Sequence, residues 1–418
     1  MIYTKRSGEF ITLMNTVHMG TNYAWIAFET LIIPTQIEIS ANSNTLSVGI
    51  IAAIGISIGV LVSLISGTVS DHFSFLWGRR GPYILFGSAF ASISIILDLL
   101  IQNSFIGILM GYILVQTGTN VSSGAYQPLF RDLIKEDQRG FATGINGVFT
   151  LLGNAFGLGV SGYLISIRFY DLSFIVMAGV LSVTAVVTTL TIKHDDLPQI
   201  FIKHGTRSRG QPIIESLRID RKFASLVIAS FTFFLGLSGL SFFEMYYFKF
   251  VLLAQNPTYL VTISGIFVLL FSAAGTAIFG ILSDKIGRLK ILFFSSLISS
   301  IGMVMIPLYL NLIYFIFLGT IIGLGYGIFF SVSKALASDM SPIDRAGKYM
   351  AIYNISVGGS AAASPFLFGL ILNYYGHNYI TGFTVMFETA ALFYIVSIFL
   401  LIPLRRPKTK DYIVPSVD

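Results

Sequence analysis

Long apolar segments alternate with short charged loops along almost the entire chain. A helix that crosses a bilayer needs about 20 mostly apolar residues. By this measure the pattern predicts an all-α membrane protein with twelve transmembrane helices, near residues 10–33, 46–69, 82–101, 105–130, 141–166, 173–192, 223–253, 259–282, 290–309, 312–336, 349–372 and 381–403. The seventh segment is long, so we expect it to begin in the cytoplasm or to tilt.

The connection at residues 193–222 is longer than the others and is polar and basic. A segment of about 30 residues cannot bury a hydrophobic core. We therefore interpret it as a cytoplasmic linker and not as a domain. It would separate an N-terminal six-helix bundle, residues 1–192, from a C-terminal six-helix bundle, residues 223–418.

Lysine and arginine are concentrated in every second loop. Such residues favour the cytoplasmic side of short loops. With twelve spans and the N-terminus inside, only Arg168 and Lys249 map to the outer side. The sequence therefore predicts cytoplasmic termini and a multi-pass protein of the cell membrane.

The composition agrees with a membrane protein and narrows the functional classes. Of the 418 residues, 54% are hydrophobic and 11% are charged, whereas soluble domains carry about 25% charged residues. The net charge of +6 lies mainly in the inner loops, so we expect no nucleic-acid partner. Cysteine is absent, which excludes disulfides and thiol catalysis. We see no Walker sequence, nucleophile–base pair or metal-ligating cluster, and expect a monomer that is not an enzyme and holds no cofactor or metal.

A charged turn follows the second apolar segment and recurs in the second half of the chain. The first copy lies between Gly67 and Ile84 and contains G-T-V-S-D and G-R-R. The second copy, residues 280–288, repeats the skeleton G-x-x-S-D…G-R. Residues 132–162 likewise align with residues 339–369. These repeats predict two related halves of the same orientation, with a cavity between them and a pseudo-twofold axis along the membrane normal.

The charged turn resembles the signature loop of the major facilitator superfamily. The spacing of seven residues from Asp71 to Gly78, followed by R-R-G-P-Y-I, is similar to that of the sucrose transporter and glycoside-pentoside-hexuronide cation symporter branch. Residues 24–34, A-W…P, resemble the first span of sucrose transporters, and residues 120–157 resemble their fourth and fifth spans. The resemblance covers residues 20–165 in detail, and it implies transport of a small solute by alternating access.

Two positions depart from the pattern of that branch. Sucrose transporters carry an acidic residue and an arginine in the fourth span, which are implicated in proton coupling and sugar binding. Here Gln116 and Gln127 take their places. Glutamine amides still donate and accept hydrogen bonds, so sugar binding is compatible with both, but proton coupling through that pair is not. The sodium-using members carry acidic residues in the second span, and this second span has none, which disfavours sodium.

Two acids are the candidates for proton coupling, Glu29 and Glu244. They lie in the first spans of the two halves, which line the cavity in the superfamily. A charge at the centre of a span costs about 2.5–3.5 kcal/mol on insertion scales, so a functional role is a reasonable hypothesis. The alternative is that both acids are hydrated near the outer interface, with Glu244 bonded to Lys249. We also expect Asp98 to be hydrated, near the outer end of its span.

Polar side chains on the predicted cavity-lining spans are the candidates for substrate binding. The set is Trp25, Asn120, Gln127, Asn146, Tyr326, Lys334, Tyr353 and Asn354. Asn146 and Tyr353 occupy equivalent places in the two halves, so both should face the centre. The alternative is that the amides join helices, a contact worth only about 0.6 kcal/mol on average.

The charged turns are candidates for a conformational latch, because ion pairs in a turn can break when helices rearrange. Carboxylates in these turns can accept hydrogen bonds from arginine. The set is Asp71, Arg79, Arg80, Asp132, Arg139, Asp284, Arg288, Asp339 and Arg345. Within it, we expect Asp132 to pair with Arg139 and Asp339 with Arg345. The alternative is that the arginines only anchor the cytoplasmic side.

The first functional hypothesis is a secondary active transporter that moves a sugar or glycoside by alternating access, with the proton as coupling ion. The second is an exporter of amphipathic drugs or metabolites, which the abundant phenylalanine and the neutral fourth span favour. A facilitative uniporter remains a further alternative. A receptor or scaffold without transport is disfavoured, because we find no soluble domain for a partner to bind.

Overall fold

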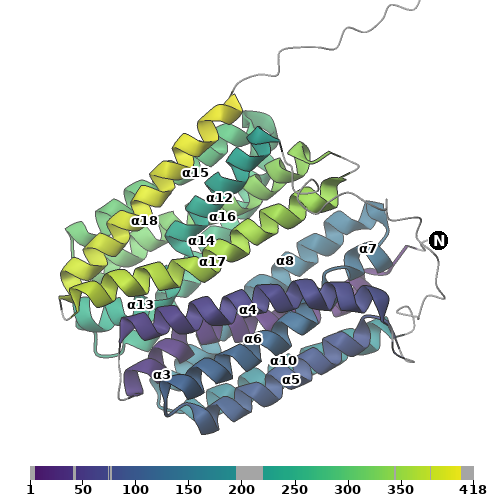
Figure 1. Ribbon diagram of the computed structural model, residues 1–418, viewed down its shortest axis with the longest axis horizontal. Helices are drawn as coiled ribbons and strands as arrows, with labels where there is room; N and C mark the ends of the chain where they lie inside the picture. Colours follow the sequence, from purple (N-terminus) through teal and green to yellow (C-terminus); the bar gives the residue numbers. More distant parts are fainter. Residues whose placement is uncertain are drawn as a thin grey trace, which may run out of the picture.

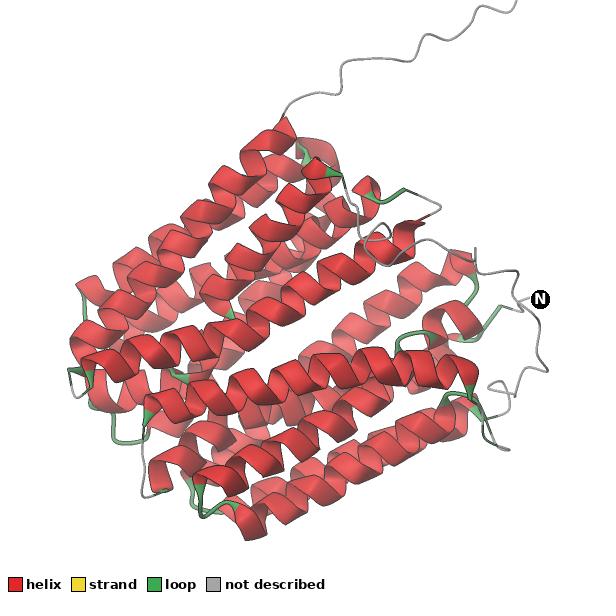
Figure 2. Cartoon of the chain, in the orientation of Figure 1, coloured by secondary structure: helices red, strands yellow, loops and turns green. Residues whose placement is uncertain are grey.

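The structure is a computed structural model that describes residues 5–40, 44–73, 75, 78–193, 220–342, 345–376 and 378–405. Most of the predicted linker therefore lies outside the described residues. Within the described ranges the chain is almost entirely helical (Figure 2). Eleven of these helices are long and apolar enough to cross a membrane. The first predicted span is not among them, because it is broken into shorter segments and carries more polar residues.

The N-terminal half forms one bundle of helices, drawn in purple to blue in Figure 1. Its elements are α1 (Gly8–Met14), α2 (Thr16–Ala27), the π-helix η1 (Phe28–Ile32), α3 (Ile33–Ile39), α4 (Thr45–His72), α5 (Gly81–Ile101), α6 (Phe105–Tyr126), α7 (Leu129–Leu133), η2 (Glu136–Gln138), α8 (Arg139–Phe156), the π-helix η3 (Gly157–Ser161), α9 (Gly162–Ser166) and α10 (Tyr170–Ile192).

The C-terminal half forms a second bundle, drawn in teal to yellow. Its elements are α12 (Arg221–Leu237), η4 (Leu240–Phe242), α13 (Glu244–Tyr246), the π-helix η5 (Tyr247–Val251), α14 (Pro257–Ile286), α15 (Arg288–Met305), η6 (Ile306–Leu308), α16 (Leu312–Met340), α17 (Ala346–Tyr375), α18 (Tyr379–Leu401) and η8 (Ile402–Arg405). Helices α4 and α17 run side by side where the two bundles meet (Figure 1).

The predicted seventh span is a broken helix. Helix α12 ends at Leu237, and a short 3-10 turn follows before the helical path resumes at Glu244. The hydroxyl of Ser364 on α17 accepts from the Gly239 backbone N–H at 2.8 Å and donates to the Leu235 carbonyl at 2.6 Å. A side chain therefore satisfies backbone groups that the break leaves without helical partners. The break explains the unusual length of this segment, for which we had expected a tilt or a cytoplasmic start.

The bundles are joined by polar contacts at one end of the molecule, which we call the closed end. The Tyr246 hydroxyl donates to the Pro34 carbonyl at 3.1 Å, and Lys249 forms an ion pair with Glu38. Two further contacts cross there, from Thr35 Oγ1 to Met245 Sδ at 3.5 Å and from Thr262 Oγ1 to the Leu158 carbonyl at 3.2 Å.

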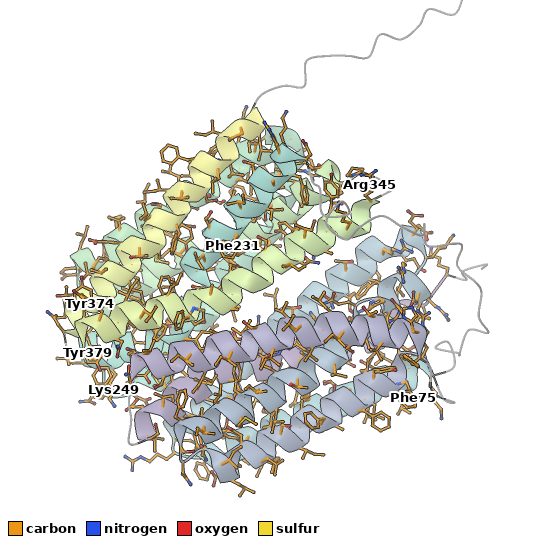
Figure 3. All side chains as sticks on the ribbon, in the orientation of Figure 1. Phe75, Phe231, Lys249, Arg345, Tyr374 and Tyr379 are labelled. Carbon is orange, nitrogen blue, oxygen red and sulfur yellow. The ribbon has the colours of Figure 1, made fainter. Side chains whose placement is uncertain are left out.

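Figure 3 shows Lys249, Tyr374 and Tyr379 at the closed end, with Phe75 and Arg345 at the opposite end. We call that opposite end the turn end, because it carries both charged turns. The helices of the two bundles diverge toward it (Figure 1).

Candidate functional site: a cavity between the two bundles

A cavity of about 520 Å³ lies between the two bundles, within the range of roughly 300–1,000 Å³ that is usual for small-molecule sites. Its polar and charged lining comes from both halves of the chain. These residues are Trp25, Glu29, Gln116, Asn120, Asn154, Ser238, Ser241, Glu244, Tyr247, Ser272 and Tyr326. Two carboxyl groups, one from each bundle, therefore face a single enclosed space.

Four polar side chains form a connected chain on the N-terminal wall. Three of them lie one helical turn apart on α6, which places them on the same face of the helix. The Asn120 amide donates to Gln116 Oε1 at 2.9 Å, and Gln116 Nε2 donates to the Tyr112 hydroxyl at 2.6 Å. Tyr112 in turn donates to Glu29 Oε1 at 3.4 Å. The carboxyl of Glu29 is thereby linked to amides that line the same cavity.

Glu29 and Glu244 both lie where their spans depart from α-helical geometry. Glu29 is in the π-helix η1, and Glu244 follows the break in the seventh span. Segments of π-helix occur frequently at functional sites, and broken spans in transporters commonly form binding sites. The Ser264 hydroxyl donates to Glu244 Oε1 at 2.5 Å. The alternative pairing of Glu244 with Lys249 is wrong, because the structure pairs Lys249 with Glu38 of the other bundle.

The C-terminal wall of the cavity is mainly apolar. Its large side chains are Met303, Ile306, Phe315, Ile322, Phe383, Met386 and Phe387. Aromatic faces and methionine can pack against apolar parts of a ligand. The same wall also carries Glu244 and serine hydroxyls, and the opposite wall offers amides and a second carboxyl. The cavity is therefore suited to a ligand with both polar and apolar parts.

Five of the predicted ligand-contacting or proton-coupling residues line this cavity: Trp25, Asn120, Tyr326, Glu29 and Glu244. The Trp25 indole donates to Thr119 Oγ1 at 3.0 Å, which fixes the ring against α6. The other predicted residues are not part of the lining.

Gln127, Lys334 and Asn354 are exposed in the structure, Gln127 at the C-cap of α6. Asn146 donates to the Tyr126 hydroxyl at 2.9 Å, and Tyr353 shares a hydrogen bond of 2.7 Å with Ser333. Asn146 thus joins α8 to α6, and Tyr353 joins α17 to α16.

The first charged turn contains a buried arginine. The side chain of Arg80 is 1% exposed and donates to Ser70 Oγ at 2.8 Å, to Asp71 at 2.5 Å and to Asp132 at 2.9 Å. Arg79 adds a hydrogen bond to Asp71 at 2.8 Å. Asp132 thus pairs with arginines that follow α4, and not with Arg139 as expected. Arg139 donates instead to the carbonyls of residues 131 and 134.

The second charged turn is smaller and more exposed. Arg288 lies 3.2 Å from Asp284 and 2.6 Å from Asp339, N to O in each case. Asp339 therefore pairs with Arg288, where we had expected Arg345. Arg345 is the residue before α17. Both turns place a glycine before the arginine at positive φ, 152° for Gly78 and 102° for Gly287, a conformation that glycine adopts without strain.

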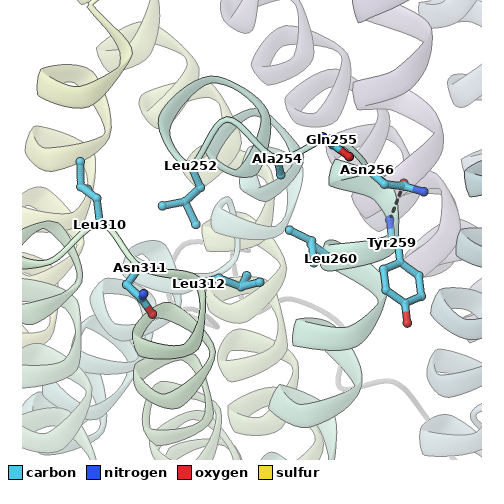
Figure 4. Close-up of a pocket in the computed structure, with 9 residues that line it drawn as sticks. All are labelled: Leu252, Ala254, Gln255, Asn256, Tyr259, Leu260, Leu310, Asn311 and Leu312. Atoms are coloured by element: carbon cyan, nitrogen blue, oxygen red, sulfur yellow. Dashed lines mark hydrogen bonds between the residues drawn. The ribbon is translucent and has the colours of Figure 1, made fainter.

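A second pocket, of about 360 Å³, lies at the closed end of the C-terminal bundle (Figure 4). Two of its polar side chains, Asn256 and Asn311, already cap α14 and α16 by accepting from backbone N–H groups. The pocket contains no acidic or basic side chain. Among the described residues, no group of three His, Cys, Asp or Glu side chains could hold a metal ion. The cavity between the bundles is therefore the candidate functional site.

The structural contacts that sequence analysis missed are between distant residues. The Lys249–Glu38 pair joins positions 211 residues apart, and no local pattern indicates it. The break in the seventh span had a local signal, the run G-L-S-G at residues 236–239, because glycine and serine favour interruption of a helix.

Comparisons with known proteins agree with this architecture. The sequence profile of the Major Facilitator Superfamily matches residues 10–271 and 253–413. An uncharacterized MFS-type transporter of Methanocaldococcus jannaschii is 23% identical over 344 residues, which cover 79% of this chain and 81% of the relative.

Solved structures with the same fold include a POT family transporter, with a TM-score of 0.74, 13% identity and coverage of 95% of this chain and 96% of that one. A bacterial homologue of the human lysosomal transporter Spinster gives a TM-score of 0.71 at 15% identity, with coverage of 96% and 98%. The nucleoside transporter NupG gives 0.73 at 11%, with coverage of 95% and 100%. With a family profile that spans almost the whole sequence and a cavity enclosed by two helical bundles, the chain belongs to the Major Facilitator Superfamily and is a multi-pass membrane transporter.

Proposed function

We propose that this transporter moves a sugar or glycoside by alternating access and couples the movement to protons through Glu29. The observation that supports the proposal is the chain from Glu29 through Tyr112 and Gln116 to Asn120, which ends on the cavity wall. Amides can donate to and accept from the hydroxyls of a sugar. A solute bound at Asn120 would then influence the hydrogen bonding of a carboxyl group that can exchange protons.

The proposal includes the membrane arrangement. We propose twelve spans, with α2, η1 and α3 together forming the first, because these consecutive segments of 12, 5 and 7 residues are long enough to cross a bilayer. The arginines of both charged turns lie at the turn end, which on the positive-inside rule is cytoplasmic. The division into bundles 1–192 and 223–418 with a linker at 193–222 is part of the same proposal. The conformation is then inward-facing, with contacts closed on the outer side.

Glu29 is preferred to Glu244 as the coupling acid. Glu29 shares a helix with Trp25 one turn earlier, and both side chains line the cavity. It is also connected to the two amides through Tyr112, whereas Glu244 contacts only the Ser264 hydroxyl among the hydrogen bonds described. The solute and the proton would therefore both bind at the N-terminal wall of the cavity.

The experiment uses purified protein in liposomes with a panel of radiolabelled mono- and disaccharides, with and without an inward pH gradient. Glu29→Gln should abolish gradient-driven accumulation but retain exchange of labelled for unlabelled solute. Exchange requires only binding and rocking of the bundles, without net proton release. Accumulation at the wild-type level by Glu29→Gln would contradict coupling through Glu29.

Two further variants serve as controls. Glu388→Gln changes an exposed glutamate of α18 that does not line the cavity, and it should accumulate solute normally. Glu244→Gln tests the second acid. If both cavity variants accumulate normally, proton coupling through either acid fails and facilitated diffusion becomes the better description.

The apolar C-terminal wall supports a second candidate function, export of amphipathic compounds. Phe315, Phe383 and Phe387 could pack against the apolar face of such a compound. The same liposomes, tested with a fluorescent amphipathic dye, separate the candidates. Dye movement without movement of any sugar would favour export, and movement of neither class would favour a protein that does not transport these solutes.

A further inference from the structure

A buried carboxyl group lies outside the cavity, in the N-terminal bundle. Asp98, on the last turn of α5, is 0% exposed, so the expectation that it is hydrated is wrong. The amide of Gln36 on α3 donates to Asp98 Oδ2 at 2.5 Å and also contacts Gln102 Oε1 at 3.3 Å. Gln36 is itself 3% exposed. Thus α3 and α5 are joined by a contact between two fully enclosed polar side chains.

Three buried oxygen atoms in this cluster have no hydrogen-bond partner: Asp98 Oδ1, Gln36 Oε1 and the Tyr170 hydroxyl. A Cβ atom added at Gly111 would lie 1.8 Å from Asp98 Oδ1, so glycine at this position leaves the space that the carboxyl group occupies. Unpartnered buried polar atoms are uncommon and costly. At least one further hydrogen-bond donor, such as a proton, can therefore be accommodated in this cluster.

The surroundings of Asp98 contain no compensating positive charge in the part of the chain described. The residues that face it are Gln36 from α3, Gly111 from α6, Tyr170 from α10 and Gln102 at the end of its own helix. The nearby Asp171 is exposed and carries the same charge. An ionised carboxylate enclosed in this way, without a paired cation, is strongly disfavoured.

A proton on Asp98 resolves both problems. The neutral carboxyl group carries no charge to compensate, and it brings one O–H donor into a cluster in which Gln36 Oε1 has no donor. A metal cation fits less well, because Gln36 turns its amide nitrogen, a donor, toward the carboxylate where a cation needs an oxygen ligand.

The cluster is tied to the contacts that close one end of the transporter. Helix α3 presents Gln36 to Asp98, and the neighbouring residues Pro34, Thr35 and Glu38 of the same helix contact the C-terminal bundle. A change in how Gln36 is held therefore acts on the helix that forms the closed end.

We propose that Asp98 is a proton-binding site that controls the closed end: its carboxyl group holds a proton in the conformation described here and releases it to water when the bundles part. This inference rests on the proposed alternating access, but it concerns a second acid, remote from the cavity. Ionisation of Asp98 breaks its O–H bond and leaves a carboxylate that the closed arrangement cannot accommodate. A rise in pH should then favour opening of the closed end.

The natural absence of cysteine permits a direct test. Ile106→Cys and Leu308→Cys place spin labels on exposed sites, 70% and 72% exposed, near the closed end of the N- and C-terminal bundles. Inter-label distances are measured in nanodiscs without solute, between about pH 5 and about pH 9. In the otherwise wild-type protein the ratio of long-distance to short-distance populations should rise by at least about tenfold, since one released proton is linked to opening. In Asp98→Asn, which retains the volume and remains neutral, the short distance should persist throughout.

Two further variants complete the test. Asp171→Asn removes the exposed carboxyl group nearest the cluster and should leave the pH dependence unchanged. Gln36→Leu removes the amide that donates to Asp98 in the closed arrangement, so the closed form loses a hydrogen bond and the midpoint of opening should move to lower pH. This second variant keeps the test decisive if Asp98→Asn fails to fold.

The proposal is overturned if Asp98→Asn opens with pH as the wild-type protein does, or if Gln36→Leu leaves the midpoint unchanged or moves it to higher pH. Lys249→Ala removes a closed-end ion pair and serves as the positive control for opening. The proposal is also overturned if this variant lengthens the inter-label distance while the wild-type distance does not change with pH. Solute uptake is measured separately, so a wild-type protein that takes up solute but whose inter-label distance does not depend on pH would reject the Asp98 site and leave the proposed function intact.

Discussion

The two charged turns share a sequence skeleton but differ in what surrounds their arginines. In the N-terminal turn the Arg80 side chain is 1% exposed and contacts two carboxylates and a serine hydroxyl. In the C-terminal turn Arg288 is 23% exposed, and its partners Asp284 and Asp339 are more than half exposed. Alignment of the glycines places Arg79 opposite Arg288 and therefore sets Arg80 opposite a leucine, Leu289.

The additional arginine changes the physical character of the first turn. Surface ion pairs contribute about 0–1 kcal/mol, because water already solvates both partners. Removal of a buried arginine costs more, because hydrogen bonds to charged groups are worth about 1.5–3 kcal/mol. We therefore infer that the N-terminal turn holds α4, α5 and α7 in place, whereas the C-terminal turn can open and re-form at little cost.

The largest expected effect comes from making the first turn resemble the second. Arg80→Leu copies the residue at position 289, and should lower the free energy of unfolding by about 1.5–3 kcal/mol, because the hydrogen bonds of a buried charged group are lost while Arg79 still lies 2.8 Å from Asp71. The matched variant Arg288→Leu should lower it by no more than about 1 kcal/mol. Unfolding midpoints in detergent, measured for both, check the difference. Equal effects of the two substitutions would contradict the distinction between a buried and an exposed turn.

A smaller effect, equal in the two turns, is expected from the glycines. Gly78 and Gly287 have φ values of 152° and 102°, so a side chain at either position introduces strain of about 1–3 kcal/mol. Gly78→Ala and Gly287→Ala should therefore lower the unfolding midpoint by similar amounts. A markedly larger loss at Gly78 would show that the buried arginine also depends on this backbone conformation.

The smallest effect on stability is expected from Asp71→Asn. Asp71 is 39% exposed, and Asp132 continues to pair with Arg80 in its absence. The unfolding free energy should fall by no more than about 1 kcal/mol, while the rate of solute uptake falls because the contact between α4 and the arginines is weakened. Uptake at the normal rate, with the protein at normal abundance, would exclude Asp71 from a latch.

The eleven spans of the structure correspond to segments that hydropathy predicts, because length and apolar character together determine whether a helix can cross a bilayer. The irregular parts were harder to predict. The π-helix around Glu29 has no break-forming residue before Pro34, and its geometry depends on neighbouring helices. The break near Gly239 depends on a hydroxyl from α17, 125 residues away.

The residues of the candidate site could likewise be predicted only in part. Equivalence of the two halves correctly indicated that Glu29 and Glu244 belong to corresponding spans, and both line the cavity. The predicted binding set also included Gln127 and Lys334, which the structure places on exposed surface. The internal repeat predicts which face of a helix points toward the centre of the molecule. It does not predict how far along the helix the cavity lies, because that position depends on where the two bundles meet. Asp98 could not be placed from sequence, since its burial depends on Gln36 and on the missing side chain at Gly111.

One turn of α17 bears on both halves of the molecule. Ser364 holds the two sides of the break in the seventh span, and the neighbouring Pro365 packs so closely on α4 that a Cβ atom at Gly49 would lie 2.5 Å from its carbonyl oxygen. We infer that this turn of α17 couples α4 to the seventh span. Under the proposed alternating access, a rotation of α4 against α17 would displace the break, whose far side carries Glu244 on the cavity wall and Lys249 at the closed end. A continuous seventh helix would have to move as one body, whereas the broken helix allows its two segments to rotate through different angles.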